Sequence, residues 1–328
     1  MARDYATSMT SSAPDAVVAD RDPAAGLRSR APLLGVEVGP LQHMSIERAR
    51  LAELTWRHFD VRRVGATVGA VITGVDITAE LPDEVIAELR LALFEYKVIF
   101  FRNQPLTAQR HVAFARRFGE LEVHPFIPGN VGTPELVRFE KSAEVGGYEN
   151  GWHHDVTWRA VPSMGAVLHA VQVPTSGGDT LFCDMYAAFD GLAPELQQRV
   201  LGLDAVHDFM RAFGRQVPQD RRAEMRETYP TVVHPVVPTH PGTGRRYLYV
   251  NRFFTDRIVG LEPDESDDLL TTLFRQADIL EYQCRFQWEP DSVAFWDNRA
   301  VQHYASSDYW PELRIMERAS IIGTRPQR

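Results

Sequence analysis

The sequence predicts a mainly β domain, a sandwich or barrel of short strands with helices packed on the outside. Two observations indicate this class: short apolar or alternating runs separated by Gly, Pro and Asp turns, and a few longer stretches with the period of an amphipathic helix. The strand-like runs of the second half are GAVLHAVQV, RYLYVN, EYQCRFQW and SVAFWD. Strands should therefore dominate this half of the chain.

The first part of the chain has a different texture. Residues 1–60 mix Ala, Ser, Pro, Asp and Arg without sustained periodicity, apart from a stretch near 46–54 that is compatible with a helix. From Val61, the run VRRVGATVGAVITGVDI combines glycines with β-branched residues and predicts strands and tight turns. We therefore expect a flexible N-terminal extension over 1–60 and one folded domain over 61–328.

Three stretches predict helices outside the sheet. DEVIAELRLALFEY, residues 83–96, places Ile86, Leu89 and Leu93 on one face, has acids in its first turn, and leads into the strand KVIFF. Residues 185–203 and 264–277 also have helical periodicity, and the second places four apolar side chains on one face. These helices should buttress the sheet.

Composition excludes several classes of protein. The 328 residues carry a formal net charge of -9, which argues against the clustered cationic surface of a nucleic-acid-binding protein. The two cysteines, Cys183 and Cys284, lie in apolar strand-like runs, so we expect buried free thiols rather than a disulfide. No apolar run has the length of a membrane span and no secretory signal is recognisable. We expect a soluble cytoplasmic protein.

Candidate metal ligands lie in ENGWHHDVTW and WDNRAVQHYA. His153 and Asp155 are separated by one residue, so on a strand both side chains would project from the same face. His303 adds a second imidazole from a strand some 150 residues later. Two histidines and one carboxylate form the facial triad of non-haem iron(II) sites, whereas zinc prefers a closed tetrahedral site or a single open position.

The residues next to these ligands receive supporting roles. On a strand, His154 would point to the opposite face, so a structural or solvent-facing role is favoured over ligation. Trp296 and Asn298 precede His303 in the WDN run, and we expect them to support the ligands without taking part in catalysis. Alone, the His-x-Asp pattern is a weak signal.

The wider set of motifs resembles a known family. WHHDVTW, SGGDTLF, WDNRAVQHYA and LRIMERASIIG are similar, in order and spacing, to the taurine/2-oxoglutarate dioxygenase (TauD/TfdA) family, over about 61–326. The resemblance implies a double-stranded β-helix, or jelly roll, with flanking helices. It also implies Fe(II), 2-oxoglutarate and O2 chemistry that hydroxylates a substrate and releases succinate and carbon dioxide.

The resemblance also assigns residues to the cosubstrate. Arg314 matches the arginine that binds the distal carboxylate of 2-oxoglutarate, and Thr180 matches its hydroxyl partner. A guanidinium binds a carboxylate through two parallel hydrogen bonds, which suits this task. Arg314 follows His303 by eleven residues, a spacing that lets the chain turn at DYWPE and return on an adjacent strand. SGGDT lacks the GK[ST] ending of a phosphate loop, so nucleotide binding is rejected.

The substrate is predicted to be a small organic anion. His124 and Arg318 match the two positions that bind the sulfonate in taurine-type members, and Arg318 shares a strand face with Arg314. Val156, Phe209 and Phe254 match the apolar positions that enclose the substrate in this family. Hydroxylation of the carbon next to a sulfonate sulfur or a sulfate oxygen would lead to C–S or C–O cleavage.

Several alternatives stay open. Glu149 stands where taurine enzymes carry an asparagine near the substrate amine, so taurine itself is not favoured. The same pocket could take a carboxylate, as in aryloxyalkanoate-cleaving relatives, or an amino acid or larger metabolite. Another class of protein, a metal-binding jelly roll without oxygenase activity or a zinc hydrolase, would need neither Arg314 nor Thr180. We also expect a homo-oligomer, either a dimer or a tetramer.

Overall fold

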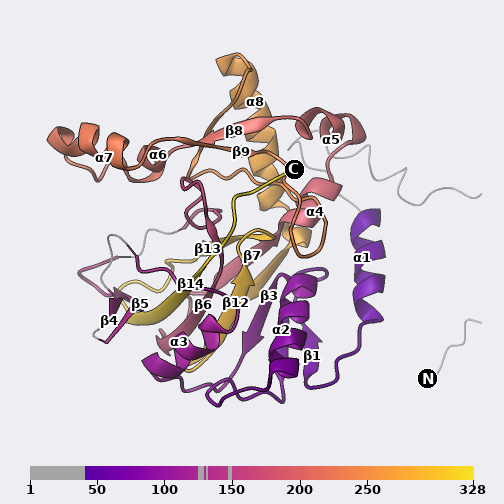
Figure 1. Ribbon diagram of the computed structural model, residues 1–328, viewed down its shortest axis with the longest axis vertical. Coiled ribbons are helices and arrows are strands. Elements are labelled where there is room, and N and C mark those ends of the chain that lie inside the picture. The colour runs from indigo at the N-terminus through magenta and orange to yellow at the C-terminus, as the bar shows by residue number, and fades with distance from the viewer. Residues whose placement is uncertain (1–40, 125–128, 131, 147–149) are drawn as a thin grey trace, which may run out of the picture. The chain divides into compact units, whose positions relative to one another are not determined.

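A computed structural model describes residues 41–124, 129–130, 132–146 and 150–328. Residues Gln42–Arg328 form one compact unit, and the elements described below belong to it (Figure 1). Helix α1 (Gln42–Ala52) lies inside this unit, and its Leu51 is buried in the core. The folded unit therefore begins before the boundary predicted at Val61, because this helix has an apolar contact with the domain. Residues 1–40 lie outside the described part.

The described strands form one large and two small sheets. The large sheet has the order β1-β2-β3-β12-β6-β14-β5-β4, and the small sheets have the orders β11-β7-β13 and β10-β8-β9. The strand bounds are β1 Asp60–Arg63, β2 Ala70–Thr73, β3 Val98–Phe101, β4 Gly129–Asn130, β5 Thr133–Lys141, β6 Ser163–Gln172, β7 Thr180–Asp184, β8 Asp204–His207, β9 Val232–Pro235, β10 Thr255–Ile258, β11 Gln283–Phe286, β12 Val293–Asp297, β13 Val301–Ala305 and β14 Arg314–Ile322.

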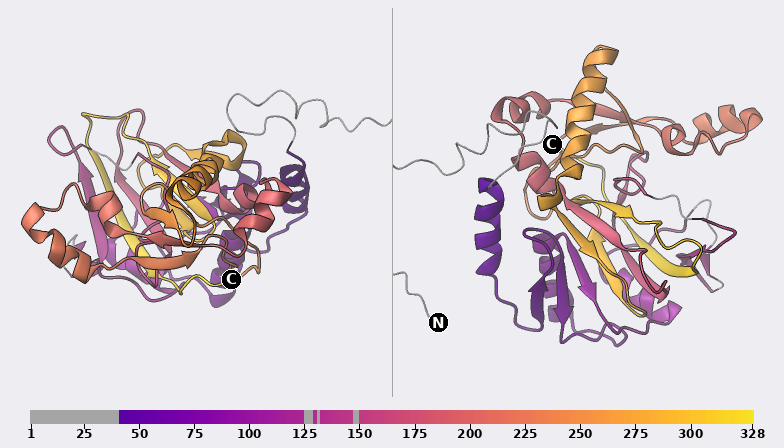
Figure 2. Two further views of the ribbon diagram at one scale, coloured as in Figure 1. Left: turned by 90° about the horizontal axis from the view of Figure 1, so that it is seen from above. Right: turned by 180° about the vertical axis from the view of Figure 1, so that it is seen from behind.

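Helices cover the outside of these sheets. Helix α2 packs on β3 and β12, helix α3 packs on β5, β6 and β14, and helix α8 packs on β10 (Figure 2). The remaining bounds are α2 Asp83–Tyr96, α3 Ala108–Arg116, α4 Met185–Asp190, α5 Pro194–Val200, α6 Phe209–Phe213, α7 Arg222–Thr228 and α8 Pro263–Phe274, with 3-10 turns η2 Gln219–Arg221, η3 Arg275–Asp278 and η4 Leu280–Tyr282. A mainly β fold with flanking helices, the jelly roll expected from the sequence, is confirmed.

Strand pleating divides the core into two layers. On β3, Ile99 and Phe101 belong to the apolar cluster beneath helices α2 and α3. Their neighbour Phe100 belongs to the cluster between the large sheet and β11-β7-β13, together with Phe182 and Trp296. Successive side chains on a strand point to opposite faces, so each central strand of the large sheet contributes to both layers.

Several predicted elements are confirmed, and one is wrong. The helix over 83–96 and the strand that follows it are present, and the helical region 185–203 is divided into α4 and α5 at Gly191. Residues 247–251 of RYLYVN are buried but form no strand, because their backbone hydrogen bonds go to separate segments. Leu248 donates to the carbonyl of Met185, and Tyr249 donates to that of Val236. A buried segment that lacks one continuous partner strand therefore has the same apolar sequence pattern as a strand.

Two predictions made from composition can be compared with the fold. Cys183 and Cys284 are buried and free, as expected. Among the described residues, no helix is long and apolar enough to cross a membrane.

Candidate active site

The segment that carries His153 and Asp155 is not the regular strand that the sequence predicted. His153 forms an isolated antiparallel bridge with His303 of β13, in which the two residues exchange both backbone hydrogen bonds, at 3.1 and 2.9 Å. Asp155 lies in the turn that follows, next to Val156 with a φ of 50°. The bridge and the turn, and not strand pleating alone, bring the two side chains together.

The three predicted ligands converge on one point. The Nε2 atoms of His153 and His303 each lie 3.9 Å from Oδ1 of Asp155, and all three residues are buried. Nδ1 of His153 lies 2.8 Å from the carbonyl oxygen of Gly151, so Nδ1 carries the proton and Nε2 keeps its lone pair. The ring of Phe253 stacks on His153 at 4.9 Å. Two imidazole nitrogens and a carboxylate oxygen in this arrangement suit an octahedral Fe(II) with open positions.

Asn298 and Trp296 contact the ligands in the way expected for supporting residues. The Asn298 side chain accepts a hydrogen bond from the backbone N–H of Asp155 at 2.7 Å and donates to its carbonyl at 3.0 Å. It also donates to the carbonyl of Ser163 at 3.1 Å. The ring of Trp296 lies 5.0 Å from that of His303. Asn298 therefore positions the turn that presents Asp155.

His154 points away from this centre, as predicted, and its environment is structural. It is fully buried, and its ring lies 4.7 Å from Tyr249. Burial, together with the neighbouring His303 and His153, holds its pKa well below the usual value. It is therefore a neutral core histidine, and of the two roles open from the sequence the solvent-facing one is excluded.

The surroundings of the site favour an ionised Asp155 and a neutral His303. Burial raises the pKa of Asp155, but Arg318, His303 and His153 outweigh it and lower the pKa to about 2. Burial and the proximity of His153 lower the pKa of His303 to about 3. These are the protonation states in which the two groups bind a cation.

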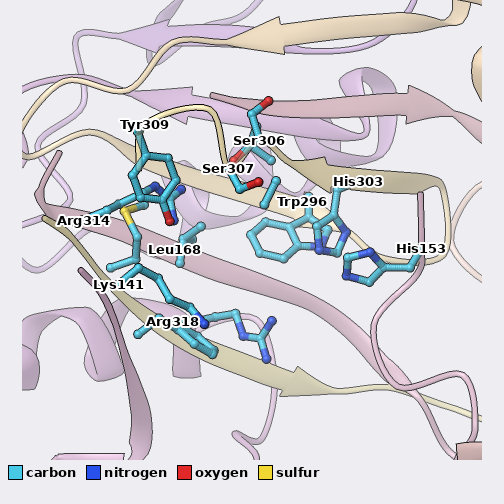
Figure 3. Close-up of a pocket in the computed structure, with 14 residues that line it drawn as sticks. Lys141, His153, Leu168, Trp296, His303, Ser306, Ser307, Tyr309, Arg314 and Arg318 are labelled. Carbon is cyan, nitrogen blue, oxygen red and sulfur yellow. The ribbon is translucent and has the colours of Figure 1, made fainter. Parts of the chain in front are cut away.

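A cavity opens beside the triad and brings together five of the eleven predicted site residues (Figure 3). It has a volume of about 720 Å³ including its mouth, and its lining contains His153, His303, Thr180, Arg314 and Arg318. Apolar side chains complete the wall, namely Phe139, Leu168, Trp296, Tyr309 and Met316.

The cavity lies between two sheets. Arg314 and Arg318 project from β14 of the large sheet, whereas Thr180 and His303 project from β7 and β13 of a small sheet. The prediction that Arg314 returns on a strand adjacent to His303 is therefore wrong. The chain crosses from one sheet of the sandwich to the other, and the two strands face each other across the cavity. Lys141, opposite Arg314 on β5, adds a third cation that the sequence analysis missed.

Thr180 is oriented by a partner that no motif indicated. The indole Nε1 of Trp288 donates to Oγ1 of Thr180 at 3.0 Å. Because an indole N–H can only donate, the hydroxyl accepts this bond and has its own proton left to donate. On the opposite wall, the guanidinium of Arg314 lies 5.7 Å from the ring of Tyr309. A hydroxyl donor and a guanidinium thus line one cavity, as a carboxylate site requires.

Arg318 connects the cavity to the triad. Its Nη1 lies 3.3 Å from both carboxylate oxygens of Asp155, and its guanidinium lies 5.0 Å from the ring of Phe139. Its Nε is buried and has no hydrogen-bond partner among the described residues. His124 is half-buried nearby: burial and the charge of Arg318 lower its pKa, which Asp155 raises.

The side chains predicted as apolar walls of the substrate site are absent from the lining of this cavity. Phe209 and Phe254 are 5% and 4% exposed, form a cluster with Trp158, and do not line the cavity. Val156 and Phe253 pack against this cluster, so Phe253 connects it to His153. Glu149 lies outside the described residues. The only signal for Phe253 in the sequence is its position next to the predicted Phe254 in NRFFTDRI.

Comparisons with known proteins identify the family. Residues 60–320 match the family model described as taurine catabolism dioxygenase TauD, TfdA family. An alpha-ketoglutarate-dependent sulfate ester dioxygenase from Pseudomonas putida is 35% identical over 275 residues, covering 81% of this chain and 90% of that protein. An (S)-phenoxypropionate/alpha-ketoglutarate-dioxygenase from Sphingobium herbicidovorans is 35% identical over 281 residues, covering 81% and 95%.

Solved structures show the same fold. A taurine dioxygenase from Burkholderia xenovorans matches with a TM-score of 0.72 and 36% identity, covering 82% of this chain and 91% of that one. AAD-2 in complex with Mn(II) and N-oxalylglycine matches with a TM-score of 0.72 and 26% identity, covering 83% and 100%. The chain belongs to the taurine catabolism dioxygenase TauD, TfdA family, and it is a non-haem iron, 2-oxoglutarate-dependent dioxygenase.

Proposed function

We propose that this dioxygenase hydroxylates a small sulfate ester or sulfonate at the carbon next to the ester oxygen or the sulfur. The observation that carries the proposal is the pair of arginines on β14: Arg314 and Arg318 line the same cavity as His153 and His303. Two guanidinium groups match two anions, the cosubstrate and the substrate.

His153, Asp155 and His303 hold the iron in this proposal. Bound Fe(II), with 2-oxoglutarate and O2, supplies the oxidising power that cleaves a substrate C–H bond. The protein fixes the ligands in place: Gly151 holds the His153 tautomer, and Asn298 holds the turn of Asp155. Hydrogen bonds of this kind orient metal ligands and are costly to remove.

Arg314 and Thr180 bind the distal carboxylate of 2-oxoglutarate. The bond from Trp288 to Thr180 supports this role, because it directs the remaining hydroxyl proton toward another acceptor. Lys141 lies opposite Arg314 in the β5–β14 ladder and adds positive charge on the same side of the cavity. The cosubstrate would thus reach from this cationic end to the metal.

Arg318 and His124 bind the substrate's sulfo group beside the metal. The bond from Arg318 Nη1 to Asp155 fixes the guanidinium, and its buried Nε supplies a donor without a partner among the described residues. The apolar side of the substrate site stays a prediction for Val156, Phe209 and Phe254. Phe253 would connect their cluster to the metal ligands, because it packs against the cluster and stacks on His153. The role of Glu149 stays a prediction too.

The products follow from the position of hydroxylation. One oxygen atom of O2 enters succinate, and the other enters the substrate as a hydroxyl group on the carbon that bears the sulfate. That hemiacetal-like ester collapses to an aldehyde and hydrogen sulfate, with the hydroxyl proton leaving with sulfate. A sulfonate gives an aldehyde and sulfite in the same way. The C–O or C–S bond is therefore broken without hydrolysis.

The test compares matched anions. Fe(II)-loaded protein is incubated with 2-oxoglutarate, O2 and either a linear alkyl sulfate, the alkanesulfonate of the same chain length, the corresponding carboxylate, or an aryloxy acid. We expect the sulfate or the sulfonate to stimulate succinate formation most, with stoichiometric release of sulfate or sulfite. Stimulation by the aryloxy acid alone would contradict the sulfo-group proposal. The substrate would then be a carboxylate, in line with the similarity to the phenoxypropionate enzyme.

The oligomeric state and the cellular location are not tested by the contacts described above. The homo-oligomer, a dimer or tetramer, and the cytoplasmic location stay predictions. Measurement of the mass in solution and fractionation of the native cells would check them.

A further inference from the structure

A second cluster of potential metal ligands lies on the opposite face of β14, beneath helix α3. His111 of α3, His169 of β6 and Glu317 of β14 are buried, and each offers a ligand atom within 4.8 Å of those of the other two. Glu317 and His169 are directly opposite each other in the β14–β6 ladder. The rings of His111 and His169 are 6.1 Å apart. The cluster thus joins three separate elements.

Hydrogen bonding assigns the tautomers of both histidines. Nε2 of His111 lies 2.9 Å from the carbonyl oxygen of Val167, and Nε2 of His169 lies 3.3 Å from Oδ1 of Asp291. Both partners are acceptors, so each Nε2 carries a proton and each Nδ1 of a neutral ring has a lone pair. Both Nδ1 atoms are buried and have no hydrogen-bond partner among the described residues.

Protonation of the rings does not satisfy these lone pairs at neutral pH. Burial lowers the pKa of His111 to about 3. Burial also lowers the pKa of His169, although Asp291 and Glu317 raise it. Glu317 accepts hydrogen bonds from Asn130 at 2.9 Å and Arg138 at 3.2 Å, both through Oε1.

We infer that His111, His169 and Glu317 bind a divalent transition-metal ion, with zinc as the best match, in a structural site behind the active centre. Two neutral imidazoles and one carboxylate are a ligand set that zinc takes in proteins. Ligand atoms at about 2.0–2.1 Å from a tetrahedral zinc are roughly 3.3 Å apart, so small side-chain rotations close the cluster. Water would occupy the fourth position.

The ion would tie α3 to β6 and β14. Arg318, which contacts Asp155, directly follows Glu317 on β14 and faces the other side of the sheet. A metal at Glu317 therefore holds the strand that carries both cavity arginines. Because an intact site exists only in the folded chain, its binding free energy adds to folding stability.

The experiment measures zinc alone, without any assay of activity. The background is the double variant His153→Ala/Asp155→Ala, which lacks two of the three predicted iron ligands. This protein is stripped with a chelator, equilibrated with Zn²⁺ by dialysis, and measured for bound metal and melting temperature. His111→Gln and Glu317→Gln are introduced separately, and His58→Gln, a histidine bonded to Glu88 away from both clusters, is the matched control.

The background and its His58→Gln control should bind one equivalent of Zn²⁺, with a rise in Tm of roughly 5 °C at a hundredfold excess over Kd. His111→Gln and Glu317→Gln should each lose the bound zinc and this rise.

Other outcomes overturn the inference. If the background binds no zinc above a nonspecific level, the cluster holds water. If one equivalent persists in both His111→Gln and Glu317→Gln, the metal binds elsewhere. Should either variant fail to fold, His169→Asn in the same background takes its place. The same two measurements are made on it, and zinc that persists there overturns the inference equally.

Discussion

The two faces of strand β14 present the same set of ligand types to different surroundings. On one face, His153, Asp155 and His303 open on a cavity that Arg314 and Arg318 also line. On the other, His111, His169 and Glu317 are covered by helix α3 and its apolar cluster. Access and neighbouring charge, more than ligand identity, separate a centre suited to catalysis from one suited to structure.

The difference in neighbouring charge has a physical consequence. The cavity side contains fixed cations, so anions can enter and bind next to a metal without leaving a charge unpaired. On the helix side, the guanidinium of Arg138 is engaged with Glu317 at 3.2 Å. A metal bound there would lie among buried side chains beneath helix α3, which suits it to holding elements together.

Removal of a ligand on the cavity side should give the largest effect. Asp155→Ala should reduce succinate formation by more than the roughly 10–100-fold typical of losing an outer-shell partner of a metal ligand. Glu317→Gln, on the other face, should reduce it far less. The measurement is 2-oxoglutarate turnover under saturating Fe(II), and equal losses in the two variants would erase the distinction between the clusters.

Truncation of Arg318 should affect substrate binding next. Arg318→Ala removes a partly buried cation that contacts Asp155, and truncating one partner of a buried charge pair costs about 2–5 kcal/mol. We expect KM for the sulfo substrate to rise by roughly 30-fold or more, with a smaller change in KM for 2-oxoglutarate. Steady-state kinetics with each substrate varied checks this, and the opposite pattern would exchange the roles of Arg314 and Arg318.

Thr180→Val should have a smaller effect, confined to the cosubstrate. The variant removes one hydrogen bond to a charged carboxylate, worth about 1.5–3 kcal/mol, so KM for 2-oxoglutarate should rise roughly 10–100-fold. Thr180→Ser keeps the hydroxyl and serves as control, with a KM near that of the parent. An unchanged KM in Thr180→Val would mean that its hydroxyl serves only Trp288.

The smallest predicted effect is the loss of folding stability at low pH that is caused by buried histidines with no carboxylate partner among the described residues. His207 is fully buried, bonded to Thr157, and close to His234, His154 and Tyr249; burial and then His234 hold its pKa well below 6.5. The unfolded chain therefore binds an extra proton below the unfolded pKa, near 6.5. Stability is fully present above that pH and falls by about 1.4 kcal/mol per pH unit and per histidine as the pH decreases.

Urea unfolding between pH 7 and pH 5 measures this slope. His207→Gln keeps an amide that can bond to Thr157 and should reduce the slope by about one proton. A slope unchanged in this variant would show that His207 titrates alike in folded and unfolded chains.

The sequence predicted those parts of the fold that depend on nearby residues. The helix over 83–96 was located to the residue, because its apolar spacing and acidic first turn are local. RYLYVN was interpreted as a strand, because periodicity registers burial and not the identity of the hydrogen-bond partners. The folded unit was predicted to begin at Val61, since nothing near Leu51 in the chain shows which cluster its side chain joins.

The candidate site divides in the same way. Resemblance to the motifs of a family predicted five of the site residues, namely His153, Asp155, His303, Thr180 and Arg314. Trp288, Lys141 and Phe253 were missed, because each reaches the site through a strand pairing or ring contact between distant segments. Phe209 and Phe254, predicted to enclose the substrate, pack in a cluster outside the lining of the cavity, and their role stays a prediction.

The sequence by itself determined which residues are candidates for the active centre, because two short motifs carry the three predicted ligands and a third carries both arginines. Only the tertiary structure decided that Glu317 and Arg318, neighbours in the chain, serve opposite faces of one sheet. It also decided that two histidines from α3 and β6 meet Glu317 there. The physical reason is the pleat: alternation is local, but what lies on each face depends on the packing of distant elements.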